Sequence, residues 1–229
     1  MQKYNIILWD IDNTLLDFQY SQKKALSACF KKAGLTITDE IVDRYDKINE
    51  SYWKMLERGE ITKERLLRER FEKLFLEYHI EGIDIENFRK DYQIGLSEYY
   101  FYIEDSLNLC KSLKTICRQY AVTNGVEFTQ VRKLQLSGLW EIFDDVFISE
   151  KIGVPKPAKE FFEACFERIP DFDKERTLII GDSLTSDMQG GINAGIATCW
   201  YNPKKESTNL RIDYEIHALK DVMGIIKGN

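Results

Sequence analysis

Two acidic residues follow a short apolar run near the start of the chain. The run is Ile6-Ile7-Leu8-Trp9, and Asp10 and Asp12 come directly after it, separated by one residue. An apolar run of this length bounded by polar residues predicts a buried strand. Carboxylates at the end of a buried strand are costly unless they meet a cation or hydrogen-bond donors. An acidic turn that starts a helix would give the same pattern, so the rest of the chain has to decide.

Polar residues also follow three later apolar runs. Thr123–Gly125 follows the first of these, and Lys156 stands between two prolines in the loop after the second. Gly181–Ser183 follows the third, with Asp187 about one helical turn beyond. Alone, the Thr-Asn-Gly pattern is most often a turn and the Lys-Pro pattern a surface loop, whereas Gly-Asp-Ser after a strand is moderately informative. Their joint occurrence at the ends of predicted strands favours a functional site.

The side chains at these positions are of two chemical kinds. Three acids offer the hard oxygen ligands that suit Mg²⁺: Asp10, Asp182 and Asp187. Three other side chains donate hydrogen bonds to an anion: Thr123, Asn124 and Lys156. A divalent cation beside anion donors is typical of phosphoryl transfer, in which charge neutralisation and positioning dominate. In such chemistry Asp10 could attack phosphorus, while Asp12 could protonate the leaving oxygen and then activate water.

These residues are far apart in the sequence, so a particular fold must bring them together. Five strands are predicted, at 6–9, 120–123, 145–148, 177–180 and 197–201. Between and after the later ones lie predicted helices near 106–118, 127–136, 159–168, 186–194 and 219–226. This alternation predicts an α/β fold with a parallel sheet covered by helices on both faces. Because the carboxyl ends of parallel strands form the ligand crevice, the acids and the donors are expected to converge there.

The segment from about residue 18 to residue 100 has no strand pattern. Its apolar periodicity predicts four helices, at 21–33, 38–59, 62–78 and 85–99. Thr38 and Thr62 can cap the second and third of these at their amino ends. Four consecutive helices predict a small bundle inserted into the α/β domain.

The composition excludes several classes of protein. The chain has 229 residues and a formal net charge of −6, which gives it no general attraction for nucleic-acid polymers or anionic membranes. We see neither a signal-peptide pattern nor an apolar run long enough to span a membrane. The five cysteines form no CxxC pair, which favours a reducing compartment and predicts a cytoplasmic protein without disulfides or a zinc site. The two histidines lie in no hydrolase pattern.

Four segments together resemble the motifs of the haloacid dehalogenase-like (HAD) hydrolase superfamily. They are Asp10-Ile-Asp12-Asn-Thr14-Leu, Thr123-Asn-Gly125, Lys156-Pro157 and Gly181-Asp-Ser-Leu-Thr-Ser-Asp187. The resemblance covers nearly the whole chain. It implies a Rossmann-like catalytic core formed by residues 1–16 and 101–229. The helical segment 17–100 lies where that superfamily carries a helical cap domain of its first type.

The resemblance also implies a role for each motif residue. Asp10 would be the nucleophile that forms an aspartyl-phosphate, and Asp12 would be the general acid and base. Mg²⁺ would be bound by Asp10, the backbone carbonyl of Asp12, and Asp182, with Asp187 supporting the metal shell. Phosphate would be bound by Thr123 and Lys156, and the amide of Asn124 is a further candidate donor.

More narrowly, the chain resembles the pyrimidine 5′-nucleotidases that act on noncanonical nucleotides. The stretches that carry this likeness are Thr123–Val126, Ser137–Leu139, Phe147–Glu150, Gly181–Gly191 and Thr198–Pro203. The implied substrate is a small phosphate ester, a pyrimidine nucleoside monophosphate. The implied cap closes over the crevice and recognises the leaving group. The neighbouring aromatic residues Tyr52 and Trp53 are candidates for that recognition.

Several alternatives stay open at this point. One is a phosphatase or mutase acting on small sugar phosphates or phosphoglycolate, and another is a non-catalytic protein that binds phosphate esters. A dehalogenase is disfavoured because Asp12 is present, and a phosphonatase would need a cap lysine such as Lys23 or Lys24. The sequence does not indicate the oligomeric state.

Overall fold

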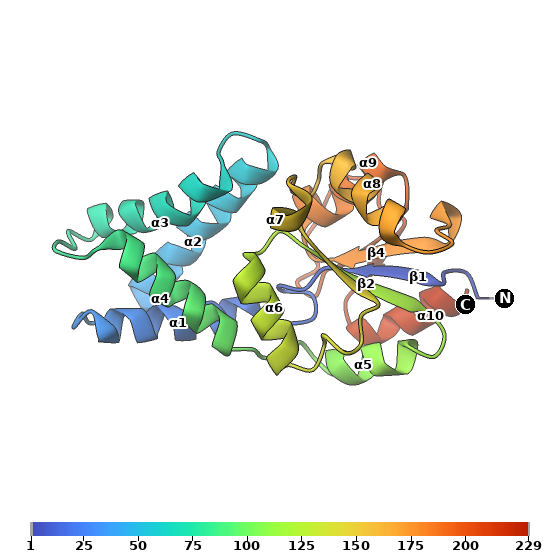
Figure 1. The fold of residues 1–229 in the computed structure, drawn as a ribbon, viewed down its shortest axis with the longest axis horizontal. Helices are drawn as coiled ribbons and strands as arrows, with labels where there is room; N and C mark the ends of the chain where they lie inside the picture. Colours follow the sequence, from blue (N-terminus) through green and yellow to red (C-terminus); the bar gives the residue numbers. More distant parts are fainter. Residues whose placement is uncertain (1, 229) are drawn as a thin grey trace. The chain divides into compact units, whose positions relative to one another are not determined.

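The structure is a computed structural model that describes residues 2–228, and it divides into two compact units (Figure 1). The first, called the sheet unit, comprises the described residues up to Asp17 together with those from Phe101 onward. The second, called the helical unit, is Phe18–Tyr100.

The sheet unit is built on six parallel strands in the order β3-β2-β1-β4-β5-β6. Their bounds are β1 Ile6–Trp9, β2 Arg118–Thr123, β3 Asp145–Ile148, β4 Thr177–Gly181, β5 Ala197–Tyr201 and β6 Tyr214–Ile216. Trp9, the last residue of β1, is in register with Ala121 of β2 and Ile180 of β4. The carboxyl ends of these three strands therefore lie side by side, and the predicted α/β fold is confirmed.

The strand β6 was not predicted. It has three residues, and its central Glu215 is exposed, so it carries too few apolar residues to be recognised as a strand. The turn before β6 fixes the position of this strand. In that turn the Asp213 carboxylate accepts hydrogen bonds from the backbone N–H and the hydroxyl of Thr198.

Helices cover both faces of the sheet. In Figure 1, α8 (Lys159–Arg168) and α9 (Gln189–Ala194) lie on one face, and α5 (Ser106–Leu113) and α10 (Val222–Lys227) lie on the other. The remaining helices of this unit are α6 (Glu127–Leu136) and the short α7 (Ser149–Ile152). On the α8 face, the strand side chains pack with Phe161 and Phe162 in a fully buried apolar cluster. This burial supplies the main stabilisation of the unit.

The helical unit consists of α1 (Phe18–Lys32), α2 (Asp39–Glu57), α3 (Lys63–Glu77) and α4 (Ile85–Glu98). The hydroxyls of Thr38 and Thr62 cap α2 and α3 by accepting from backbone N–H groups, as predicted. The unit's core is rich in aromatic rings, with Phe71 fully buried among the others.

The chain leaves the sheet unit and returns to it through two paired segments. The Asp17 N–H donates to the Phe101 carbonyl, and the Ile103 N–H donates to the Leu15 carbonyl. Within residues 2–228, the five cysteines are free and buried. Among the same residues, no helix has both the length and the apolar character needed to cross a membrane.

Candidate active site

Asp10 lies directly after the central strand β1 and is almost completely buried. Its backbone N–H continues the sheet by donating to the Ile180 carbonyl, and the residue as a whole is 8% exposed. The Thr14 hydroxyl donates to Asp10 Oδ2 at 3.0 Å and accepts from the Asp182 N–H at 3.1 Å. Thr14 therefore links the loop after β1 to the loop after β4.

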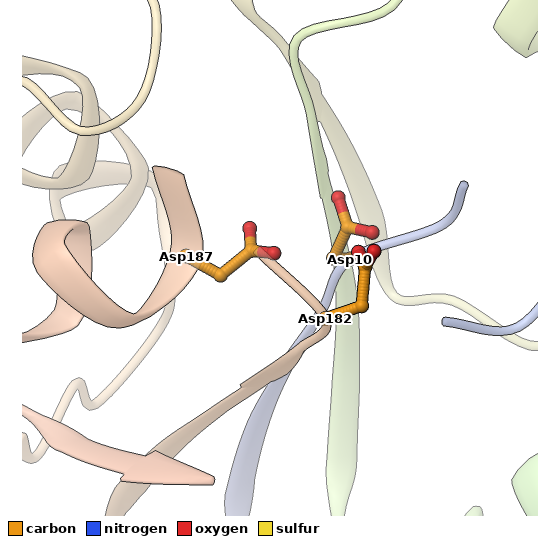
Figure 2. Close-up of side chains that lie close together, drawn as sticks. All are labelled: Asp10, Asp182 and Asp187. Carbon is orange, nitrogen blue, oxygen red and sulfur yellow. The ribbon is translucent and has the colours of Figure 1, made fainter. Parts of the chain in front are cut away.

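The acids after β1 and β4 form one cluster. Asp10, Asp182 and Asp187 each place a carboxylate oxygen within 4.8 Å of the others (Figure 2). Asp187 belongs to the π-helical turn Leu184–Met188 that follows β4. Its Oδ2 accepts from the Ser183 N–H at 3.1 Å, which fixes the direction of the carboxylate.

Lys156 supplies the positive charge of this cluster. Its buried Nζ lies 2.8 Å from Asp10 Oδ1 and 2.6 Å from Asp187 Oδ1, and it also donates to the Val122 carbonyl at 2.8 Å. Burial opposes the charged ammonium, but the two carboxylates outweigh it and raise the pKa of Lys156. The lysine therefore stays charged and joins β2, the loop after β1 and the turn after β4.

The three acids of the cluster carry more charge than Lys156 can neutralise. Burial, followed by repulsion from Asp187, raises the pKa of Asp10 to about 7, although Lys156 acts in the opposite direction. Burial and the charge of Asp10 likewise raise the pKa of Asp182 well above its ordinary value. A group of buried carboxylates that resists ionisation is a site that favours a further cation. All the donors are hard oxygens, which fits Mg²⁺.

The residues after β2 support this cluster in a way that the sequence did not indicate. The Asn124 amide donates to the Lys156 carbonyl and accepts from the Lys156 N–H, both at 2.9 Å. This side chain holds the Lys156 backbone, and its direct contact with phosphate stays a prediction. The Thr123 hydroxyl accepts from the Gly125 N–H at 3.0 Å, so it shapes the turn at the end of β2.

The Asp12 carboxylate is bound by two side chains of α6. Gln130 Nε2 donates to Asp12 Oδ2 at 2.6 Å, and the Lys133 ammonium pairs with Asp12 Oδ1. Sequence reasoning missed both partners. Their spacing of three residues places them on one helix face, but the same spacing is common among solvated charges and gives little warning of a site.

The two aromatic residues predicted to contribute to substrate recognition lie in the second half of α2. Tyr52 and Trp53 are both half-buried. The Tyr52 ring packs against the aromatic core of the helical unit, and Lys73 Nζ lies 6.0 Å from its centroid. A role for either residue in substrate choice stays a prediction.

The fold and the cluster define a class of enzyme. A parallel sheet has a central strand that ends in a buried acid, and neighbouring loops add a lysine and two further acids. This arrangement can hold a cation and an anionic group at the same edge of the sheet. The chain belongs to the haloacid dehalogenase-like hydrolases, whose family model matches residues 4–195.

Particular members of this family are similar along almost the whole chain. The HAD-hydrolase YfnB of Bacillus subtilis is 39% identical over 99% of this chain and 97% of its own length. The pyrimidine 5′-nucleotidase PynA of Streptococcus pneumoniae is 37% identical over 99% and 96%. The pyrimidine 5′-nucleotidase YjjG of Escherichia coli is 31% identical over 87% of each chain.

A solved structure extends the likeness to three dimensions. The crystal structure of YfnB bound to magnesium superposes with a TM-score of 0.93 and covers 98% of this chain and 99% of that one. The family and the similar proteins agree with the superfamily and the branch inferred from the motifs.

Proposed function

We propose that this protein is a Mg²⁺-dependent phosphomonoester hydrolase that acts through an aspartyl-phosphate on Asp10. The observation that carries the proposal is the buried contact of Asp10 with Lys156 at the end of β1, beside Asp182. In this proposal the Asp10 carboxylate is the nucleophile, and the Lys156 ammonium attracts the phosphate group.

The reaction has two steps. In the first, an Asp10 oxygen forms a bond to phosphorus, the bond to the leaving oxygen breaks, and Asp12 gives that oxygen a proton. In the second, water attacks the same phosphorus while Asp12 takes its proton, and the bond to Asp10 breaks. Inorganic phosphate leaves, and both acids return to their starting states.

The acid cluster fits the metal that this chemistry needs. Asp10 and Asp182 would hold Mg²⁺ together with the backbone carbonyl of Asp12, while Asp187, whose two oxygens are engaged by Lys156 and Ser183, would keep the site in shape. When bound, Mg²⁺ offsets the negative charge of the phosphate group and of the acids.

The proposed substrate is a pyrimidine nucleoside 5′-monophosphate. Two similar proteins named as pyrimidine 5′-nucleotidases support this choice, as do the branch-like stretches of the sequence. We assign the catalytic role to residues 1–16 and 101–229 and the cap role to residues 17–100, with Tyr52 and Trp53 contributing to substrate choice. The free, buried cysteines favour a cytoplasmic location.

A phosphate-release assay tests the proposal. Pyrimidine and purine nucleotides, sugar phosphates and phosphoglycolate would be compared with and without Mg²⁺, with Asp10→Asn as the matched control. We expect Mg²⁺-dependent release that is greatest for pyrimidine nucleotides and that falls at least about 1,000-fold in the folded control variant.

The other outcomes separate the remaining functions. Near-normal turnover by Asp10→Asn would remove Asp10 as the nucleophile. Isomerisation of a sugar phosphate without net phosphate release would identify a mutase. Binding of phosphate esters by the wild-type protein without any turnover would identify a binding protein.

A further inference from the structure

We propose that Gln130 and Lys133 are positioning residues for the acid and base Asp12, an inference that rests on the proposed hydrolase function. The two side chains, called the Asp12 clamp below, approach the carboxylate from α6. Gln130 Nε2 bonds one carboxylate oxygen and the Lys133 ammonium bonds the other. Two contacts on two different oxygens fix both the location and the rotation of the carboxylate, which a single contact would leave free.

The burial of the three side chains differs in a way that suits this role. The Lys133 side chain is 1% exposed and Gln130 is also buried, whereas the Asp12 side chain is 23% exposed. The clamp therefore holds the carboxylate from the protein side and leaves part of it open to solvent. A group that exchanges protons with a leaving oxygen and with water needs this combination of a fixed position and an open face.

The clamp is not explained by stability. A buried ammonium loses its hydration, and the Gln130 Oε1 atom is buried without a hydrogen-bond partner among the described residues. An apolar pair of similar volume would pack at this position without either cost. Polar groups retained at a cost to stability next to a reacting acid point to a function.

The turn after β2 is shaped to admit the clamp. A Cβ atom at Gly125 would clash with Gln130 Nε2, so any larger residue there would displace the amide. Gly125 follows the Thr123 and Asn124 pair, and the same turn thus arranges one side of the acid cluster and the approach of Gln130 to Asp12.

The test removes one contact of the clamp and compares two leaving groups. Lys133→Met keeps most of the length of the side chain and removes its charge. Gln130→Met removes the amide and leaves the Lys133 charge in place. The neighbouring exposed Arg132 gives the matched control Arg132→Met. The substrates are p-nitrophenyl phosphate, whose phenolate departs without a proton, and the best nucleotide of the wild-type protein, whose alkoxide needs one.

If the clamp positions Asp12, its loss should lower kcat/KM for the two substrates to different extents. For Lys133→Met we expect kcat/KM for the nucleotide to fall roughly 10- to 100-fold, with a smaller fall for Gln130→Met. The kcat/KM for p-nitrophenyl phosphate should stay close to the wild-type value, because that parameter ends with departure of the leaving group. For p-nitrophenyl phosphate, kcat and KM should fall together, because water activation in the second step also needs Asp12. Lys133→Arg should restore part of the kcat/KM that Lys133→Met loses with the nucleotide.

The alternative outcomes are distinct. Equal losses of kcat/KM for the two substrates would indicate a purely structural role and overturn the proposal, as would wild-type values in both clamp variants. A wild-type protein that hydrolyses neither substrate would instead overturn the proposed function. If Lys133→Met does not fold, Gln130→Met and Lys133→Arg still decide the question through the ratio of the two kcat/KM values.

Discussion

At the scale of single residues, the site depends on side chains that hold other side chains. Asp10 and Lys156 meet directly, but each is placed by a neighbour, Thr14 in one case and Asn124 in the other. Thr14 restricts the rotamers of the Asp10 side chain, and Asn124 fixes the backbone from which the Lys156 side chain extends.

Asn124 offers a clear test of this positioning. In Asn124→Ala the Lys156 backbone loses both of its amide contacts, and its buried N–H is left unpaired. We expect a loss of about 1–3 kcal/mol in the free energy of unfolding and a roughly 10- to 100-fold loss of turnover, measured by denaturant unfolding and phosphate release.

The chain supplies a matched control for this variant. Asn193 also donates to this segment, at the Pro157 carbonyl, but it is exposed. Asn193→Ala should change both quantities little. Equal effects of the two substitutions would show that the Asn124 amide has no special part in placing Lys156.

The site residues that can be predicted from the sequence differ from the others in what determines their position. Asp10, Asp182 and Lys156 follow predicted strands or stand between prolines, so local pattern and fold topology together indicate that they converge. Gln130 and Lys133 lie on a helix, and only the packing of α6 against the loop after β1 shows that their polar ends are buried. Sequence periodicity reports which face a residue occupies but not what covers that face.

At the scale of elements, the aromatic core of the helical unit explains why four helices stay together. The Phe71 ring stacks on Tyr45 with centroids 5.2 Å apart and meets Tyr92 edge-on at 5.1 Å. The hydrophobic pattern predicted these helices well because each turns one apolar face toward the same core. The strand β6 does not stand out in the sequence because its three residues form no apolar run, and the short helix α7 does not because four residues are about one turn and show no helical period.

Phe71 is the residue whose loss should weaken this unit most clearly. Phe71→Ala removes a fully buried ring and leaves a cavity, so we expect the free energy of unfolding of the helical unit to fall by about 3–5 kcal/mol. Leu76→Ala on the same helix is the control, because Leu76 is 77% exposed and its loss should change stability by less than about 0.5 kcal/mol. Thermal unfolding followed by near-UV and far-UV circular dichroism measures both. A Phe71→Ala protein as stable as the control would show that the aromatic cluster is not the stabilising core.

At the scale of the whole molecule, the acid cluster and Lys156 lie at the edge shared by strands that are distant in sequence. β1 begins the chain, and its neighbours β2 and β4 come more than a hundred residues later, after the helical unit has been inserted. The alternation of strands and helices made this topology predictable, since parallel strands joined by helices form one crevice. The balance of charge in that crevice was not predictable, because it depends on how deeply each acid is buried.

That balance makes the stability of the molecule depend on pH and on Mg²⁺. The pKa of Asp10 rises from its ordinary value of 3.8 to about 7 in the folded protein, and that of Asp182 also rises, in both cases mainly through burial. Between about pH 4 and pH 7 the folded state holds protons that the unfolded state has released. The contribution of these acids to the free energy of unfolding should therefore be fully favourable below about pH 4 and should be lost as pH rises through about 7. The pKa of Lys156 is raised above a value that is already beyond this window, so its contribution stays constant across it.

A cation that occupies the cluster replaces those protons, so Mg²⁺ should stabilise the protein more at high pH than at low pH. At about 100 times its Kd, Mg²⁺ should add about 3 kcal/mol near pH 8, which corresponds to a rise in Tm of roughly 5–10 °C. Near pH 5.5 protons compete for the same carboxylates, and the rise should be much smaller. Differential scanning fluorimetry with and without Mg²⁺ at each pH, at matched ionic strength, isolates this effect from all other titrating groups. Asp182→Asn removes a predicted ligand and should abolish both the rise and its pH dependence, whereas an equal rise at the two pH values in the wild-type protein would show that Mg²⁺ binds elsewhere.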